Sequence, residues 1–234
     1  MGTFSVKSHK FKEIQMNKFI ILILLAVSLW ADVRIEYYKS GEIKNKINFL
    51  DNKRHGLTTV YYMNGHVKSK LHYKNERLDG VTQDYFSNTK LETELTFIDG
   101  KIEGEVKHYF LSGKLKSIRN YKNDKLNGMS KQYWQNGKLK AKLEFVNGKT
   151  DGIVKDYYKN GTLRAKRTYK NGMLDGVSKS YYANGKVCVS AFYKKDKVVE
   201  GTGFTKEGDN CKILVNNIAP KNQNRLEVFK VFEK

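Results

Sequence analysis

Short segments with alternating apolar and polar residues recur along the chain at a fixed spacing. In residues 139–145 (LKAKLEF) the alternation is strict, which is typical of a half-buried β-strand. Similar segments recur every 24 residues, each after a glycine, and these glycines are Gly56, Gly80, Gly104, Gly128, Gly152 and Gly176. A repeat without insertions or deletions over six units indicates a tandem array rather than one closed domain.

Each 24-residue unit contains the features of one β-hairpin. Five residues after the glycine come two adjacent aromatic residues, as in Tyr157 and Tyr158, and then a turn such as Asn160-Gly161. Asn-Gly favours a type I′ turn, because both residues tolerate positive φ. We expect a longer second turn between units, and we expect the two adjacent aromatic side chains to point to opposite faces.

The repeat sets the domain boundaries. Asp32 begins a seventh copy on the N-terminal side, so residues 32–200 hold seven repeats. Residues 201–234 contain a degenerate partial repeat and are expected to cap the array. The predicted fold is all-β: an elongated, twisted, open single-layer antiparallel sheet of tandem hairpins.

Two recurring blocks of this pattern resemble the bacterial variant of the MORN repeat family. They are Tyr-Tyr-x-Asn-Gly-x-Leu, as in residues 157–163, and Tyr-Lys-Asn-Gly-x-Leu-Asp-Gly at residues 169–176. The resemblance covers about residues 32–200 and implies an elongated sheet of consecutive hairpins. It also implies either a role like that of the YwqK-type antitoxin components or a role as a membrane-junction scaffold, so it specifies the fold better than the function.

The N-terminal residues 1–31 have the pattern of a signal peptide, whose start is either Met1 or Met16. Lys18 precedes the apolar run 19–30, which is too short to span a bilayer but fits an export signal. Cleavage after Ala31 would release the array at its first repeat, and Ser28 offers an alternative site. We expect an exported protein, periplasmic or secreted, and the alternative is a retained N-terminal membrane anchor.

Charge and aromatic residues point to binding. The formal net charge is +20, and lysines recur in columns beside the aromatic columns. A sheet face of aromatic and basic residues is therefore the candidate binding surface for a protein or peptide partner. Its predicted members are Tyr62, Phe86, Phe110, Trp134, Tyr158, Tyr182, Lys107, Lys131, Lys155 and Lys179.

Three other interpretations of this surface stay open. An anionic membrane surface, phospholipid or lipopolysaccharide, is one alternative partner, and a cognate toxin is another. The lysines are also explained without a ligand, because lysine keeps a long sheet soluble. Nucleic acid is disfavoured, since arginine is scarce and no RNA-binding motif occurs.

The sequence contains no recognisable catalytic or metal-binding motif. None of the five histidines stands at a metal-ligand spacing from another histidine or a cysteine, and nucleotide-binding motifs are absent. We therefore predict no enzyme activity and no cofactor or metal. The acidic residues before the repeat glycines, Asp79, Glu103, Asp151 and Asp175, are interpreted as caps of the local backbone.

The two cysteines occupy equivalent positions in adjacent units. Cys188 and Cys211 each follow a glycine by three residues, and disulfides are common in exported proteins. Equivalent positions in a regular array lie about 9.5 Å apart, beyond the roughly 7 Å limit for a disulfide. A Cys188–Cys211 disulfide would therefore require a distorted last unit, and free thiols are the alternative.

Overall fold

The computed structural model describes residues 32–204, 206 and 210–212. The predicted signal peptide and most of the predicted cap lie outside these residues. The described chain divides into two units, residues 32–115 with 121–125, and residues 116–120 with 126 onward.

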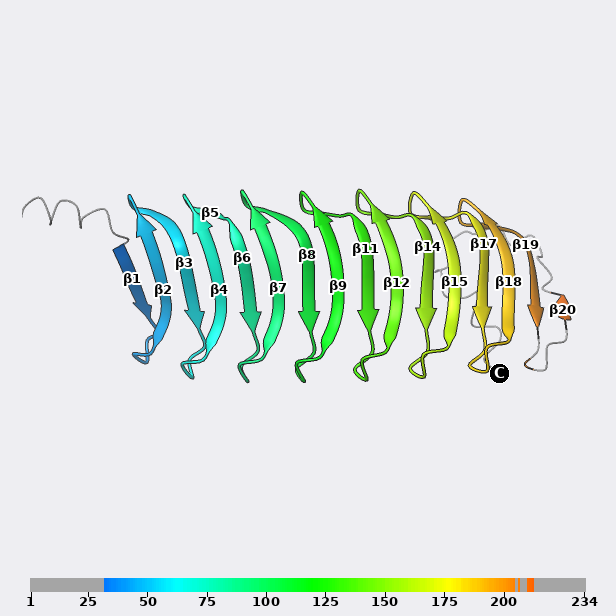
Figure 1. The fold of residues 1–234 in the computed structure, drawn as a ribbon, viewed down its shortest axis with the longest axis horizontal. Helices are drawn as coiled ribbons and strands as arrows, with labels where there is room; N and C mark the ends of the chain where they lie inside the picture. Colours follow the sequence, from blue (N-terminus) through cyan, green and yellow to red (C-terminus); the bar gives the residue numbers. More distant parts are fainter. Residues whose placement is uncertain (1–31, 205, 207–209, 213–234) are drawn as a thin grey trace, which may run out of the picture. The chain divides into compact units, whose positions relative to one another are not determined.

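In the first unit every regular element is a β-strand within the described residues (Figure 1). The strands are β1 (Asp32–Tyr37), β2 (Ile43–Leu50), β3 (Lys53–Tyr61), β4 (Val67–Lys74), β5 (Arg77–Leu78), β6 (Gly80–Tyr85), β7 (Leu91–Ile98) and β8 (Lys101–Tyr109). Strands β1–β2, β3–β4 and β6–β7 form antiparallel hairpins, and β2–β3, β4–β6 and β7–β8 join them. Strands β9 (Leu115–Lys122) and β10 (Lys125–Leu126) contain the boundary between the units.

The second unit repeats the same arrangement. Its strands are β11 (Gly128–Tyr133), β12 (Leu139–Val146), β13 (Lys149–Thr150), β14 (Gly152–Tyr157), β15 (Leu163–Lys170), β16 (Met173–Leu174), β17 (Gly176–Tyr181), β18 (Val187–Lys194), β19 (Lys197–Phe204) and β20 (Asn210–Lys212). Strands β11–β12, β14–β15 and β17–β18 form hairpins, while β18–β19 and β19–β20 extend the sheet. The prediction of an all-β, open antiparallel sheet of tandem hairpins is confirmed in each unit.

The two turns of the repeat are the reverse of what the sequence predicted. In the Tyr62–His66 turn the Gly65 N–H donates to the Tyr62 carbonyl (2.9 Å) and the Tyr62 N–H to the His66 carbonyl (2.8 Å). Gly65 has positive φ but Asn64 does not, so this is a three-residue loop with a bulge at the glycine and not a type I′ turn. The tight turn joins the repeats instead, where Asn75 and Glu76 both have positive φ.

One face of each sheet is buried by its own side chains. The second residue after every repeat glycine is buried, and these residues are Thr58, Thr82, Val106, Ser130, Val154 and Ser178. They are short, and most of them pair with a longer side chain, such as Leu71, Leu95 or Leu143. Longer neighbours exclude water from short side chains, which gives a single-layer sheet a buried face without a second layer.

Candidate binding surface

Strand register assigns every side chain of the repeat to one of two faces. Antiparallel partners share a face, and successive residues alternate between faces. Ser130, Ala141 and Val154 therefore define the buried face, because all three are buried. The alternate positions form the opposite side of the sheet, which we call the polar face, and Lys131, Lys142 and Lys155 belong to it.

The aromatic residues of the predicted binding surface connect successive repeats. The Tyr62 hydroxyl donates to the Tyr85 carbonyl (2.7 Å), and the Tyr158 hydroxyl to the Tyr181 carbonyl (2.7 Å). Trp134 uses its indole N–H in the same way, with Tyr157 as acceptor (3.2 Å). The partner in these bonds is 23 residues away, so the aromatic residue of one repeat is hydrogen-bonded to the next. Packing and hydrogen bonding explain these side chains without a ligand.

The remaining predicted aromatic positions fit the same description. The Tyr182 hydroxyl donates to the Phe204 carbonyl (2.8 Å). Phe86 and Phe110 occupy the equivalent position without a hydroxyl, and both are half-buried. The surface role predicted for this column stays a prediction.

The two adjacent aromatic residues of each repeat follow an irregularity in the sheet register, and their predicted placement on opposite faces stays a prediction. The sheet register shifts immediately before the first of them, between Asp84 and Tyr85 for example. The Lys70 ammonium lies 5.8 Å from the Tyr85 ring, and the Lys68 ammonium lies 5.8 Å from the Tyr62 ring. Both lysines lie on β4, so each of the two aromatic columns is within cation–π range of a lysine of the neighbouring strand.

Lysines lie side by side across the polar face of the second unit. In register, Lys131 pairs with Lys142, Lys142 with Lys155, Lys155 with Lys166, and Lys166 with Lys179. The five lysines thus occupy one line across β11, β12, β14, β15 and β17, with about 4.8 Å between neighbouring strands. We call these five residues the lysine row.

Among the residues that the structure describes, no side chain forms an ion pair with a lysine of this row. Glu144 is the one carboxylate on the polar face between β11 and β17, and it stands two residues from Lys142. Like charges on directly opposite residues destabilise a sheet, and this spacing is shorter than the Debye length of about 8 Å at physiological salt. Folding therefore does not account for the lysine row.

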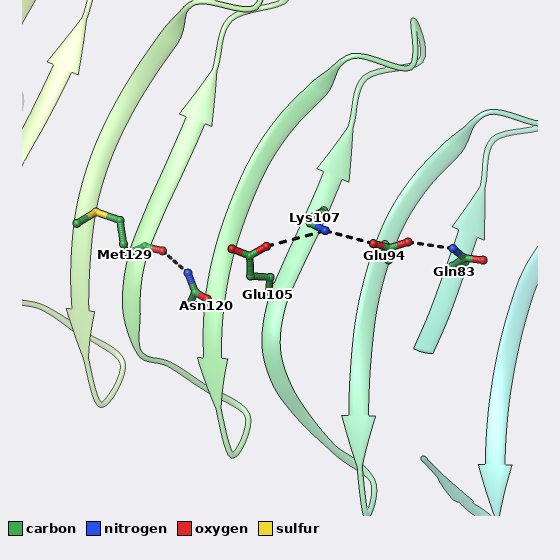
Figure 2. A network of polar contacts seen from close by, with 6 residues as sticks. All are labelled: Gln83, Glu94, Glu105, Lys107, Asn120 and Met129. Carbon is green, nitrogen blue, oxygen red and sulfur yellow. Dashed lines mark hydrogen bonds and ion pairs between the residues drawn. The ribbon is translucent and has the colours of Figure 1, made fainter. Parts of the chain in front are cut away.

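The equivalent line in the first unit carries fewer lysines, and one of them is ion-paired. It reads Lys46, Thr59, Lys70, Gln83, Glu94 and Lys107 across consecutive strands. Lys107 lies 3.4 Å from Glu94 and 3.9 Å from Glu105, and the Gln83 amide donates to Glu94 (2.9 Å) (Figure 2). Lys107 therefore belongs to an ion-paired network, unlike Lys131, Lys155 and Lys179.

Apolar and aromatic side chains flank the lysine row. Ile153 and Val177 lie on the polar face two residues before Lys155 and Lys179 and are 46% and 50% exposed. Met129 is equivalent to them in β11, and its carbonyl accepts a hydrogen bond from the Asn120 amide (2.6 Å) (Figure 2). The second unit thus presents positive charge beside exposed apolar surface.

Trp134 adds an aromatic ring to this surface. The Lys140 ammonium lies 4.7 Å from the centre of the ring and that of Lys159 lies 5.7 Å away. Both distances are within the range of cation–π attraction. Trp134 therefore belongs both to the contact between repeats and to the positively charged surface.

The recurrent carboxylates cap backbone, as predicted, but most of them cap the next repeat. Glu103 accepts a hydrogen bond from the Asn123 N–H (2.8 Å), and Asp151 accepts one from the Asn171 N–H (2.9 Å). Asp79 contacts the Asp99 N–H (3.4 Å) in the same manner. Asp175 differs, since it pairs with Lys194 at 3.3 Å.

A further carboxylate has a perturbed pKa. The Arg54 backbone N–H, and then the Arg54 side chain, hold the pKa of Glu76 below its usual value by donating hydrogen bonds to the carboxylate. Glu76 lies in the tight turn between repeats, so this carboxylate also fixes backbone. None of these contacts places an acid beside a base and a nucleophile.

The predicted disulfide stays a prediction. Cys188 is a half-buried free thiol in the structure. Strand β19 lies between β18, which contains Cys188, and β20, which contains Cys211. The Cys211 side chain lies outside the described part of the chain.

The described residues contain neither a metal-binding cluster nor a membrane-spanning helix. No group of three or more histidine, cysteine, aspartate or glutamate side chains is arranged to hold a metal ion there. None of the described elements is a helix long and apolar enough to cross a membrane.

Comparison with known proteins bears on the repeat itself. Five segments of the chain match the family model described as the MORN repeat variant. The matched residues are 54–75, 102–123, 126–147, 150–171 and 174–195. Residues 78–99, between the first two matched MORN segments, form strands of the same register. No curated protein sequence matches the chain. The five matched segments indicate a repeat scaffold.

Proposed function

We propose that this chain is an exported, non-catalytic scaffold that binds an acidic protein or peptide partner through the polar face of its second unit. The observation that carries the proposal is the lysine row, in which five adjacent strands place a lysine in register. This row lowers the stability of the sheet and lacks ion pairs with the described residues. A partner carrying carboxylates would neutralise it, because charge complementarity favours association and speeds encounter.

The binding test compares two variants of equal charge. The first changes Lys142, Lys155 and Lys166 to Glu, in the centre of the row. The control changes Lys149, Lys170 and Lys197 to Glu, which are exposed and lie next to the tight turns of the same unit. The probe is fluorescein-labelled poly-L-glutamate at physiological salt, measured by fluorescence anisotropy.

We expect the row variant to bind the probe at least about tenfold more weakly than the control, with a smaller dependence on salt. Equal loss in both variants would show that net charge alone drives binding and would refute the lysine row as the site. The same variants then serve to identify the natural partner, because a true partner binds the control variant more tightly than the row variant.

A second candidate function is binding to an anionic membrane surface, and the exposed apolar residues favour it. Ile153 and Val177 stand beside the lysines, and a basic surface with apolar residues also suits anionic lipid headgroups. Co-sedimentation with phosphatidylglycerol vesicles, with phosphatidylcholine vesicles as control, separates the two candidates. Loss of sedimentation on changing Ile153 and Val177 to Ser would favour the membrane, since poly-L-glutamate has no apolar groups to contact them.

Neutralisation of a cognate toxin is a more specific form of the proposed protein binding, and the family resemblance implies it. A toxin would be one example of a protein partner for the lysine row. Its test is rescue of cells that express a toxic neighbouring gene, with the row variant as the inactive comparison.

A further inference from the structure

Strand β1 is an exposed sheet edge. All six of its residues, Asp32–Tyr37, are exposed, and it pairs antiparallel with β2. Within the described residues β1 has no second partner strand. An edge of this kind offers unpaired backbone N–H and C=O groups to another chain.

The repeat shows how such an edge is paired. Ile35 and Glu36 are the third and fourth residues after the start of their unit, and the equivalent residues in later units pair with the preceding strand. In β6 these are Gln83, paired with Lys70, and Asp84, paired with Ser69. In β17 they are Lys179, paired with Lys166, and Ser180, paired with Ala165. The backbone of β1 is therefore of a type that pairs on both sides.

The side chains of β1 alternate between two kinds. Val33, Ile35 and Tyr37 are 52%, 39% and 59% exposed, although all three are large and apolar or aromatic. Arg34 and Glu36 alternate with them and point to the opposite face. The Arg34 guanidinium stacks 4.4 Å from the Phe49 ring, and the Glu36 carboxylate accepts a hydrogen bond from the Asn45 amide (2.6 Å).

This sequence is complementary to itself. When two β1 strands run antiparallel with Ile35 opposite its own copy, Val33 of each strand stands opposite Tyr37 of the other. On the other face, Arg34 of each strand stands opposite Glu36 of the other. Every apolar residue then meets an apolar residue, and both charged pairs join opposite signs, which is the favourable kind of cross-strand pair.

We propose that two copies of this chain dimerise through antiparallel pairing of β1 with β1, centred on Ile35. The contact is a two-fold symmetric one, so it closes at the dimer and does not continue into a fibre. Only one strand from each copy takes part, and an interface this small gives a weak, reversible dimer. The fraction of chains in the dimer therefore rises with protein concentration. The proposal concerns a surface separate from the lysine row and does not depend on it.

The experiment uses charge reversal on the chain as purified, with its N-terminal residue determined by mass spectrometry. Sedimentation equilibrium measures the dimer dissociation constant for the wild type, Arg34→Glu, Glu36→Arg and the double variant. In each single variant both charged pairs become like-charged, and we expect dimerisation to weaken by about tenfold. The double variant restores both opposite pairs with the signs exchanged and is expected to recover the wild-type constant.

A mixture of the two single variants provides a second test. One chain then carries two glutamates and the other two arginines, so the mixture is expected to form heterodimers, detected by native mass spectrometry. Both Arg34→Glu and the double variant lose the contact with Phe49, so recovery in the double variant separates dimerisation from a folding effect. A monomeric wild type at about 100 μM, or equal dimerisation in all four chains, would overturn the proposal. Binding of poly-L-glutamate by a chain that fails to dimerise would leave the proposed function intact.

Discussion

The hydrogen bond from Tyr62 to the next repeat allows a sharp test of the structural role of the aromatic column. Tyr62→Phe removes only the hydroxyl, which lies 2.7 Å from the Tyr85 carbonyl, an ordinary distance for such a bond. A hydrogen bond of this kind contributes about 0.5–1.5 kcal/mol to stability. For a chain of this size, a loss of about 1 kcal/mol lowers the melting temperature by roughly 2–4 °C.

Phe86 permits the reverse experiment. It occupies the position of Tyr62 one repeat later and is half-buried, so Phe86→Tyr would supply the missing hydroxyl, with the Tyr109 carbonyl as acceptor. We expect this change to raise the midpoint of urea unfolding, followed by far-UV circular dichroism, and Tyr62→Phe to lower it. The gain is expected to reach about 1 kcal/mol at most, since the new side chain is ordered only on folding.

Tyr61 supplies the control. It adjoins Tyr62 and is also half-buried, but its hydroxyl forms no hydrogen bond with the described residues. Tyr61→Phe should therefore leave the midpoint unchanged. If Tyr62→Phe behaved like Tyr61→Phe, and Phe86→Tyr gave no gain, the hydroxyls would not hold the repeats together and the aromatic column would need another explanation.

Three further changes test other parts of the structure. Thr89 has positive φ (68°) where other repeats have glycine, so Thr89→Gly should stabilise the chain by about 0.5–1 kcal/mol in urea unfolding; a loss would show that the threonine is not strained. The buried Thr82 hydroxyl has no hydrogen-bond partner, so Thr82→Val, which copies Val106, should raise the melting temperature by about 2 °C, with no rise if the hydroxyl is already satisfied by water. Lys155→Glu should stabilise the sheet by about 0.5–1 kcal/mol at low salt and less at high salt, whereas Lys149→Glu should change little; a salt-independent effect would contradict the electrostatic cause.

The amino-acid sequence by itself determined the hairpin repeat. Strand and turn preferences act over a few residues, and the 24-residue period displays them seven times. The segment 139–145, predicted as a strand from its alternation, is nearly all of β12 (Leu139–Val146). The capping role of Glu103 and Asp151 also followed from residue type, although the backbone that they cap is in the next repeat.

Tertiary structure decided what depends on strand pairing. Lys142 and Lys166 were not predicted as site residues, because they join the lysine row only through their register with Lys131, Lys155 and Lys179. Writing the antiparallel register across successive repeats would have revealed them.

Strand pairing also explains why some predictions differ from the structure. The sequence does not show that Glu94 neutralises Lys107, or that the partner of the Tyr62 hydroxyl is 23 residues away. Nor does it show that the tight turn lies at Asn171-Gly172 rather than at Asn160-Gly161, since Asn-Gly occurs in both turns and tolerates positive φ in both. Residue preferences are local, whereas the neighbours of a side chain on a sheet come from other strands, and only the folded register brings them together.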